Sequence, residues 1–231
     1  DKQEQPEDEL TCLVVVPPEA EPPRPEPPTA PLPAFPPAPA AAPPPGPAVQ
    51  LVSSIPVESA IGDHSMPAAA ETWAEMINGA RRTLELEHFY LSHWPGEPTG
   101  PVLDAIGRAA GRGVAVRILL DVRFKPTYPH PADSLGKLPG IELRWIDMKN
   151  VSGGGVQHGK WMLVDGVQML VGSQNLDWRS LKHIHELGVR VRDARVTGLF
   201  QRVFESDWIA AAPNAGPMVQ EHPSKVLRGA L

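Results

Sequence analysis

The stretch that decides the fold of this chain is QHGKWMLVDGVQMLVGSQNLDWRSLKHIHELGV, which runs from Gln157 to Val189. Within it, Asp165-Gly166 is a strong two-residue turn signal between the apolar runs Trp161–Val164 and Val167–Val171. The stretch therefore predicts a β-hairpin with one short turn.

The hairpin also predicts a cluster of polar side chains. His158 and Lys160 are two residues apart, so on an extended chain they point to the same face. Fifteen residues after each come Ser173 and Asn175, and folding back of the hairpin would bring them beside the first pair. An imidazole, an ammonium, a hydroxyl and an amide that converge on one point suit a reaction centre with several anionic oxygens.

Helical and extended patterns alternate on both sides of this hairpin, from about Gln50 onward. Helices are expected at Ala69–Arg82, from Pro101 to Gly111, at Asp133–Leu138 and at Ala194–Trp208 with Asp193 as N-cap, and strands at Thr83–Tyr90, Val114–Leu120, Ile141–Ile146 and Leu187–Val191. The alternation predicts an α/β fold, a mixed β-sheet flanked by helices in an α-β-α sandwich.

Three regions differ in composition. Residues 1–49 form a Pro/Ala-rich segment that predicts an extended, disordered tether, either a semi-rigid spacer or a ligand for a partner. The domain is expected at 50–210, and 211–231 returns to Ala, Pro and Gly, typical of a tail or linker. A targeting segment could precede Asp1, which together with the spacer would suit an extracytoplasmic protein.

Charge and cysteine content exclude several classes of site. The net charge of -6 lies within residues 1–50, and the rest of the chain is balanced, so no broad footprint for duplex nucleic acid is expected. Cys12 is the only cysteine, which excludes an internal disulfide and a thiolate metal site. No apolar run approaches 18 residues, so a transmembrane helix is not expected.

Some polar residues near the hairpin carry a weaker signal. Asp177 and Arg179 predict an internal pair that buttresses the loop after Asn175. His183 and His185 have the spacing of metal ligands, but no third ligand is evident, so no metal site is expected there.

Two further segments flank the polar cluster. Gly153–Gly155 lacks the Lys-Ser/Thr that follows a P-loop, so it predicts a flexible approach to the His158 strand. His88 and Tyr90 end a predicted strand and are candidates for lining the pocket.

On these residues the chain resembles the phospholipase D superfamily. The signature of that family, His-x-Lys-x4-Asp followed by Gly-Ser-x-Asn, is filled without a departure by His158, Lys160, Asp165, Gly172, Ser173 and Asn175. Glu186 matches the acidic residue that, in the family, accepts a hydrogen bond from the ring of the nucleophilic histidine. Asp165 also has a complete explanation as turn chemistry, so a structural role is expected for it.

The resemblance extends over about Leu51–Trp208 and favours one branch, which contains endolysosomal 5′-exonucleases, historically named phospholipases, and poxvirus envelope proteins. The segments that carry it are LVSSIP (Leu51–Pro56), EHFYLS (Glu87–Ser92), IDMKNV (Ile146–Val151) and SQNLDWRSLKHIHELGV (Ser173–Val189).

The resemblance implies a phosphodiesterase that works through a covalent phosphohistidine, with two His/Lys sets on opposite sides of the phosphate. Of the eight histidines, only His158 is followed by Lys two positions on. The second set is therefore expected from a missing C-terminal half in cis or from a second copy in trans, as a homodimer. The isolated monomer is expected to be inactive.

Single-stranded nucleic acid and phospholipid both present the required phosphodiester and remain alternatives. No cofactor or metal is expected, because Lys160, Asn175 and their counterparts would neutralise the phosphate. A lipid-directed transferase would need an apolar groove beside His158. A catalytically silent half, kept as a structural or interaction module, is the rival from another class, and the intact motif argues against it.

Overall fold

The computed structural model describes residues 44–213 and 215. Most of the predicted tether at 1–49 and most of the predicted tail at 211–231 lie outside the described residues.

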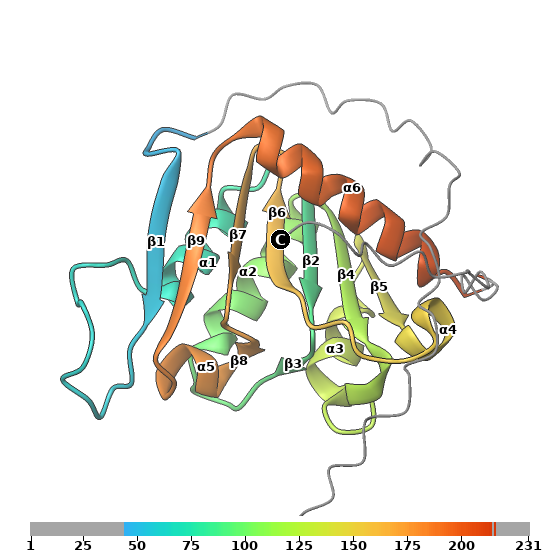
Figure 1. Cartoon of the computed structure of the whole chain (residues 1–231), viewed down its shortest axis with the longest axis horizontal. Helices are drawn as coiled ribbons and strands as arrows, with labels where there is room; N and C mark the ends of the chain where they lie inside the picture. Colours follow the sequence, from blue (N-terminus) through green and yellow to red (C-terminus); the bar gives the residue numbers. More distant parts are fainter. Residues whose placement is uncertain (1–43, 214, 216–231) are drawn as a thin grey trace, which may run out of the picture. The chain divides into compact units, whose positions relative to one another are not determined.

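A mixed sheet forms the centre of the described part of the chain (Figure 1). Its strands lie in the order β1-β9-β7-β6-β2-β4-β5, with β2, β4 and β5 parallel and every other neighbouring pair antiparallel. The strands are β1 (Val49–Ser54), β2 (Thr83–His88), β4 (Ala115–Asp121), β5 (Ile141–Ile146), β6 (Lys160–Val164), β7 (Gln168–Gly172) and β9 (Glu186–Val191). The prediction of a mixed α/β sheet is confirmed.

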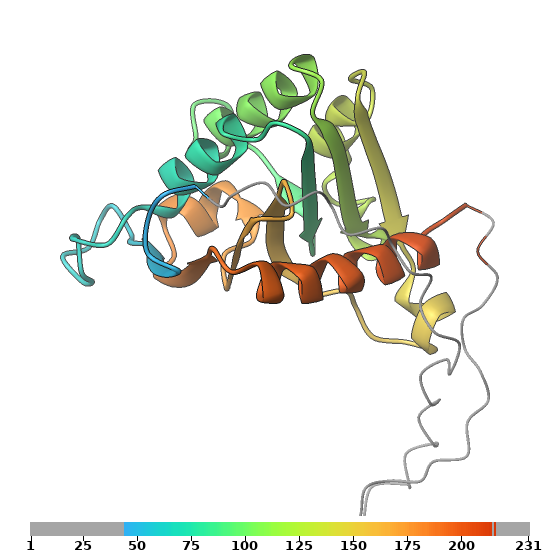
Figure 2. The same ribbon diagram turned by 90° about the horizontal axis from the view of Figure 1, so that it is seen from above.

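Helices cover both faces of this sheet. Helices α1 (Ala69–Asn78) and α2 (Thr99–Gly111) lie on one face, and α6 (Ala194–Ala210) crosses the other (Figure 2). The remaining elements are short: β3 (Leu91–Ser92) paired in parallel with β8 (Leu176–Asp177), η1 (Val122–Phe124), α3 (Pro129–Leu135), α4 (Met148–Ser152) and α5 (Trp178–Lys182). The α-β-α sandwich is therefore confirmed as well.

Each face of the sheet has its own apolar core. The larger core joins the sheet to α1 and α2 and includes Trp73, Met76, Ile77, Leu86 and Ile106. The smaller one joins the sheet to α6 and includes Leu163, Trp161, Phe204 and Trp208. Burial of such side chains contributes about 1.5–3 kcal/mol each, which fixes the layers that position the site.

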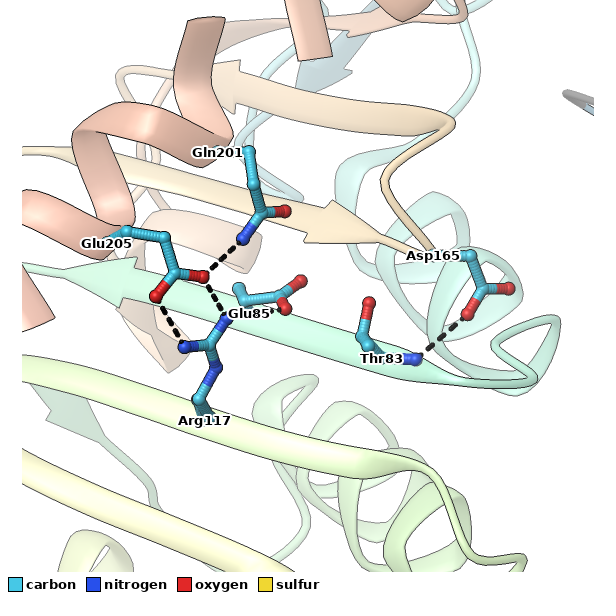
Figure 3. A network of polar contacts seen from close by, with 6 residues as sticks. All are labelled: Thr83, Glu85, Arg117, Asp165, Gln201 and Glu205. Atoms are coloured by element: carbon cyan, nitrogen blue, oxygen red, sulfur yellow. Dashed lines mark hydrogen bonds and ion pairs between the residues drawn. The ribbon is translucent and has the colours of Figure 1, made fainter. Parts of the chain in front are cut away.

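The interface between the sheet and α6 also buries charge. Arg117 donates to Glu85 at 3.0 Å and to Glu205 at 2.8 Å, and Gln201 donates to Glu205 at 2.9 Å (Figure 3). The Arg117 guanidinium also lies 4.8 Å from the centroid of the Phe204 ring. Strand β2 reads as an amphipathic strand in the sequence, yet α6 covers its polar side, and Arg117 supplies a partner for the buried Glu85 carboxylate.

The predicted turn at Asp165-Gly166 is present. Asp165 and Gly166 have φ of 56° and 69°, and the N–H of Val167 donates to the carbonyl of Val164 at 3.1 Å. Val167 is left outside the ladder, so β7 begins at Gln168 rather than one residue earlier. Asp before Gly suits the paired left-handed conformation that such a turn requires.

The carboxylate of Asp165 ties this turn to the start of β2. Its oxygens accept hydrogen bonds from the backbone N–H groups of Arg81 at 3.0 and 3.2 Å, Arg82 at 2.7 Å and Thr83 at 3.0 Å. Figure 3 shows the contact to Thr83. These donors satisfy a carboxylate that is itself buried, which is a structural function.

Several predicted boundaries need correction. The helix expected at Asp133–Leu138 is wrong in position, because α3 occupies Pro129–Leu135. Proline is tolerated in the first turn of a helix, where its missing N–H has no partner to lose, so the two prolines start this helix. The helix expected to run to Arg82 ends at Asn78, and the strand expected to reach Tyr90 ends at His88.

The predicted N-cap of the last helix is confirmed. The Asp193 side chain accepts hydrogen bonds from the backbone N–H groups of Arg195 and Val196. None of the helices in the described ranges is both long and apolar enough to cross a membrane.

Candidate active site

The polar cluster lies where the parallel strands β2 and β4 end and β6 begins. His158 immediately precedes β6, and Lys160 is the first residue of that strand. In the β2–β6 pairing, Lys160 is opposite His88, the last residue of β2. The carboxyl ends of parallel strands are the usual place for ligand sites in open α/β sheets.

His158 and Lys160 are in direct contact. The Lys160 Nζ lies 3.1 Å from Nδ1 and 3.3 Å from Nε2 of the imidazole, and it donates to the His158 carbonyl at 2.9 Å. The Phe89 ring packs edge-on against the imidazole with a centroid distance of 4.5 Å. His158 is exposed and Lys160 is buried, so the imidazole is presented to solvent above an ammonium group.

This environment favours a neutral imidazole. Desolvation, followed by the charge of Lys160, lowers the pKa of His158. Burial also lowers the pKa of Lys160, while the nearby Glu186 carboxylate acts to raise it. A neutral imidazole is the form that can attack an electrophile.

Gly172 is required by the close approach of two strands. It pairs with Gly188 across β7 and β9, and a Cβ added at Gly172 would come 2.7 Å from the Gly188 Cα. The next residue, Ser173, donates its backbone N–H to the Leu187 carbonyl at 3.0 Å. The motif glycine thus lets the loop that carries Ser173 and Asn175 lie against the start of β9.

Glu186 joins this loop to Lys160. Burial raises the pKa of Glu186, whereas hydrogen bonds with Ser180 and Ser173 and the charge of Lys160 act to lower it. Ser180 also accepts a hydrogen bond from the Asn175 backbone N–H at 3.2 Å. The Glu186 carboxylate is therefore near enough to the Lys160 ammonium for their charges to interact, and Ser180 links the same region to the Asn175 backbone.

The contact that the family resemblance implied between Glu186 and the His158 ring is not among the hydrogen bonds of residues 44–213. The carboxylate of Glu186 instead acts on Lys160, and Lys160 contacts the ring. Its influence on His158 in this structure is therefore indirect.

Two acceptor atoms in the cluster lack partners within the described part of the chain. They are Asn175 Oδ1 and Glu186 Oε2, both buried. An unsatisfied buried polar atom costs about 1–3 kcal/mol, and such atoms are typical of sites that a ligand or water completes.

The pair expected between Asp177 and Arg179 is present. The two side chains form a close ion pair, and Asp177 also accepts the Arg179 backbone N–H at 2.7 Å, which caps α5. Asp177 accepts a further hydrogen bond from the Tyr90 hydroxyl at 2.9 Å. Asp177 is almost fully buried, so these contacts hold the loop after Asn175 in place.

Sequence reasoning missed the residues that hold the backbone in front of His158. Gln157 donates its backbone N–H to Asp121 at 2.7 Å and its side-chain amide to Glu87, also at 2.7 Å. Burial, followed by the charge of Asp207, raises the pKa of Glu87 to about 8. In the sequence, Glu85 and Glu87 alternate with apolar residues along a predicted strand. That pattern is typical of a solvent-exposed face, so it gave no indication of this role.

His88 lies in the interior of the domain rather than on the exposed surface of the site. It is almost fully buried and its ring is 5.3 Å from that of Trp73. Burial, and then the charge of Lys160, lowers the pKa of His88 to about 3, so it is neutral at physiological pH. Tyr90 is half-buried and remains at the edge of the site.

Within residues 44–213, the other candidates make no hydrogen bond or ion pair to His158, Lys160, Asn175 or Glu186. His183 pairs with Glu58 at 2.8 Å, and no group of three or more His, Cys, Asp or Glu within the described ranges could hold a metal ion. The Gly155 carbonyl accepts a hydrogen bond from exposed Arg123 at 3.1 Å, so Gly153–Gly155 is a surface loop ahead of His158.

Comparisons with known proteins fit this geometry. The family described as "Cardiolipin synthase, PLD-like domain" matches residues 74–208. Among curated proteins, the chain is 32% identical to phospholipase D Z of Dictyostelium discoideum over 177 residues, which cover 71% of the chain and 40% of that relative. It is 33% identical to the virion nicking-joining enzyme of Vaccinia virus (strain Western Reserve) over 146 residues, or 62% of the chain and 34% of the relative.

A third relative is the 5′-3′ exonuclease PLD3 of Bos taurus, 32% identical over 175 residues, which cover 68% of the chain and 34% of the relative. The chain thus spans well under half the length of these curated relatives. Two solved structures share its fold. NucT from Helicobacter pylori has a TM-score of 0.55 and 16% identity, with 63% of the chain and 89% of that chain covered. Nuc from Salmonella typhimurium, a phospholipase D family member, has a TM-score of 0.54 and 21% identity, with 76% and 98% covered.

Proposed function

Because this chain belongs to the phospholipase D superfamily, we propose that it supplies one half of a phosphodiesterase active site, with His158 as nucleophile. The observation that carries the proposal is the contact of the Lys160 ammonium with both ring nitrogens of His158. An ammonium at that position keeps the imidazole neutral and lies where a phosphoryl oxygen would arrive.

The proposed reaction has two steps. A ring nitrogen of His158 attacks phosphorus, and the P–O bond to the leaving group breaks as a phosphohistidine forms. A protonated histidine of the other half gives its proton to the leaving oxygen. That second histidine then takes a proton from water, which attacks phosphorus, releases a phosphate monoester and restores His158.

The other residues of the cluster have distinct proposed roles. Lys160 and Asn175 hold the non-bridging oxygens of the phosphate, and Ser173 supplies a hydroxyl at the rim. Glu186 is a positioning residue that acts through Lys160. The negative charge that builds up is neutralised by these groups and by their counterparts in the other half, so the proposed chemistry needs no metal.

Two sources of the second half are possible under this proposal. One is a further phospholipase D-like half in cis, and the other is a second copy of the chain in a homodimer. Residues 50–210 form the proposed half, with 1–49 as a Pro/Ala-rich tether and 211–231 as a tail or linker. The substrate is a phosphodiester of single-stranded nucleic acid or of a phospholipid.

The test measures hydrolysis of a single-stranded oligonucleotide and of phospholipid vesicles over a series of chain concentrations. A homodimer predicts activity per chain that rises with concentration, and a cis arrangement predicts activity only when the second half is joined to the chain. Constant activity per chain from a strict monomer would contradict the half-site proposal.

The His158→Ala variant distinguishes the proposed enzyme from its rival, a catalytically silent module. His158→Ala should abolish hydrolysis by the completed site and leave the melting temperature unchanged. Hydrolysis that is unaffected by His158→Ala, or the lack of any hydrolysis by a completed site with an intact motif, would leave the silent module as the better account.

A further inference from the structure

Four aromatic side chains form a continuous group that begins at His158. The group, named here the aromatic ladder, consists of Phe89, Phe124, Tyr90 and Tyr128. Phe89 is 4.5 Å from the His158 ring and 4.2 Å from the Phe124 ring, as measured between centroids. Tyr90 is 5.2 Å from Phe124 and 4.9 Å from Tyr128.

Three rings of the ladder are nearly parallel. The angle between ring planes is 8° for Phe124 and Tyr128, 21° for Tyr90 and Tyr128, and 29° for Tyr90 and Phe124. In contrast, Phe89 meets both His158 and Phe124 edge-on at 67°. Because the three ring planes have nearly the same orientation, a further flat ring can stack parallel to them.

Core packing does not account for the ladder. Phe89 and Phe124 belong to neither of the two buried apolar clusters, and all four rings are half-buried. The chain brings Phe124 and Tyr128 to this place on η1 and the segment before α3, directly after β4. Rings that pack on one another at the rim of a site, rather than in a core, are typical of a binding surface.

Polar contacts fix the two tyrosines. The Tyr90 hydroxyl donates to the buried Asp177 carboxylate at 2.9 Å, and Arg179 donates to the Tyr128 hydroxyl at 3.3 Å. Asp177 and Arg179 also pair with each other, so both rings are tied to one rigid ion pair. Rings held in this way lose little conformational entropy when a ligand stacks on them.

Cations flank the ladder. Arg123 and Lys125 are the exposed neighbours of Phe124 in the sequence, and the Lys125 Nζ lies 5.4 Å from the Trp145 centroid. Arg179 lies at the Tyr128 end, and the Lys160 Nζ is 5.4 Å from the Phe89 centroid. Flat rings interleaved with cations match a nucleic-acid strand, in which bases alternate with phosphates. An acyl chain would instead require an aliphatic groove, and the neighbours of this surface are aromatic and charged.

We propose that the aromatic ladder is a stacking site for the bases of single-stranded nucleic acid, adjacent to the phosphodiester held at His158. This inference rests on the proposed function, and it selects between the two substrate classes. Because every base has a π-face, the site should tolerate any sequence and distinguish a strand with bases from one without them.

The test measures binding of two oligonucleotides of equal length to the full chain. One consists of thymidine nucleotides, and the other consists of abasic phosphodiesters. Binding is followed by fluorescence anisotropy at a fixed salt concentration. Phe124→Leu and Tyr128→Leu, singly and together, remove rings but keep apolar side chains. Each should weaken binding of the thymidine strand by about 5- to 100-fold, and neither should change the affinity for the abasic strand by more than about twofold.

Matched controls separate stacking from damage to the fold. Tyr128→Phe keeps the ring and loses only the hydroxyl contact with Arg179, so it should weaken binding of the thymidine strand less than Tyr128→Leu does. Phe200→Leu removes a half-buried ring of α6 that packs against Trp161 of β6, and it should have no effect on binding. The melting temperature of every variant is measured, and the single variants remain informative if the double variant does not fold.

Lys160→Met distinguishes failure of this inference from failure of the proposed function. The account expects it to weaken binding of both strands. Unchanged thymidine binding in the ladder variants, with Lys160→Met still weakening both strands, would overturn the ladder and leave the proposed function standing. If Lys160→Met weakens neither strand, the proposed phosphate site is wrong. Ladder variants that reduce binding of phosphatidylglycerol vesicles, and not of the strand, would overturn the inference in favour of a lipid.

Discussion

The two ends of β6 use one sequence motif in opposite ways. At the end near Asp165, both carboxylate oxygens accept hydrogen bonds from the backbone at the start of β2. At the end near Lys160, acceptors of Asn175 and Glu186 are buried without partners in the described part of the chain. The two ends are about 17 Å apart along the strand, so they cannot share a ligand.

The two ends therefore separate the residues of the motif that maintain the fold from those that are available for chemistry. A saturated polar group stabilises the structure and has no capacity left for a substrate. An unsaturated one costs stability, and the chain tolerates that cost where water supplies the missing donors beside a functional site. Variants that change one end at a time, measured for both stability and activity, test this division of roles.

The largest effect is expected from His158→Ala, at the end near Lys160. It should reduce hydrolysis by the completed site by about a thousandfold or more, since the nucleophile is lost. The free energy of unfolding should stay within about 0.5 kcal/mol, because the imidazole is exposed. Steady-state hydrolysis and urea unfolding check both expectations, and exposed His64→Ala is the matched control. A large loss of stability in His158→Ala would show that the imidazole also maintains the fold.

Asp165→Ala should have the reverse profile. It removes the acceptor of three backbone N–H groups and places a Cβ-bearing residue without a local acceptor at positive φ, so we expect a loss of about 3 kcal/mol in the free energy of unfolding. Asp165→Asn, which keeps an acceptor and tolerates this conformation, should lose about 1 kcal/mol. Urea unfolding measures the difference. Equal losses for the two variants would show that these hydrogen bonds contribute little.

A third and smaller effect concerns Glu87, which holds Gln157 in front of His158. Its pKa is raised from 4.5 to about 8, so its protonated form is favoured in the folded state. The stabilisation is therefore complete below pH 4.5 and is lost as the pH rises through about 8. The unaltered chain should lose on the order of 2 kcal/mol of unfolding free energy between pH 5 and pH 8. Glu87→Gln should remove that loss, because the amide does not ionise.

Urea unfolding at both pH values tests the Glu87 prediction. Glu71→Gln, on the exposed surface of α1, provides a control for the loss of a carboxylate. The same change of stability with pH in the Glu87→Gln variant and in the unaltered chain would contradict the assignment.

Local chemistry made much of this predictable from the sequence. The Asp165-Gly166 turn, the contact of His158 with Lys160 and the Asp193 cap all depend on residues that are close in sequence. Spacing and turn chemistry decide such features directly. The order of helices and strands, and hence the layered fold, followed from periodicity for the same reason.

Features that depend on long-range packing were not predictable in this way. Glu85 and Glu87 alternate with apolar residues, and such alternation gives no indication that α6 covers them or that Arg117 supplies a partner. The approach of Phe124 and Tyr128 to Tyr90 likewise depends on how β4 lies beside β2. Tertiary packing, rather than local preference, decides both.

The most direct test of the central claim is an NMR titration of the His158 ring, with and without inorganic phosphate. The account predicts a pKa below the ordinary histidine value of 6.5, which rises when phosphate binds and also rises in Lys160→Met, because each change removes or offsets the positive charge beside the ring. A His158 pKa at or above 6.5 that neither phosphate nor Lys160→Met alters would contradict the claim that these two residues form a phosphate-binding nucleophilic site.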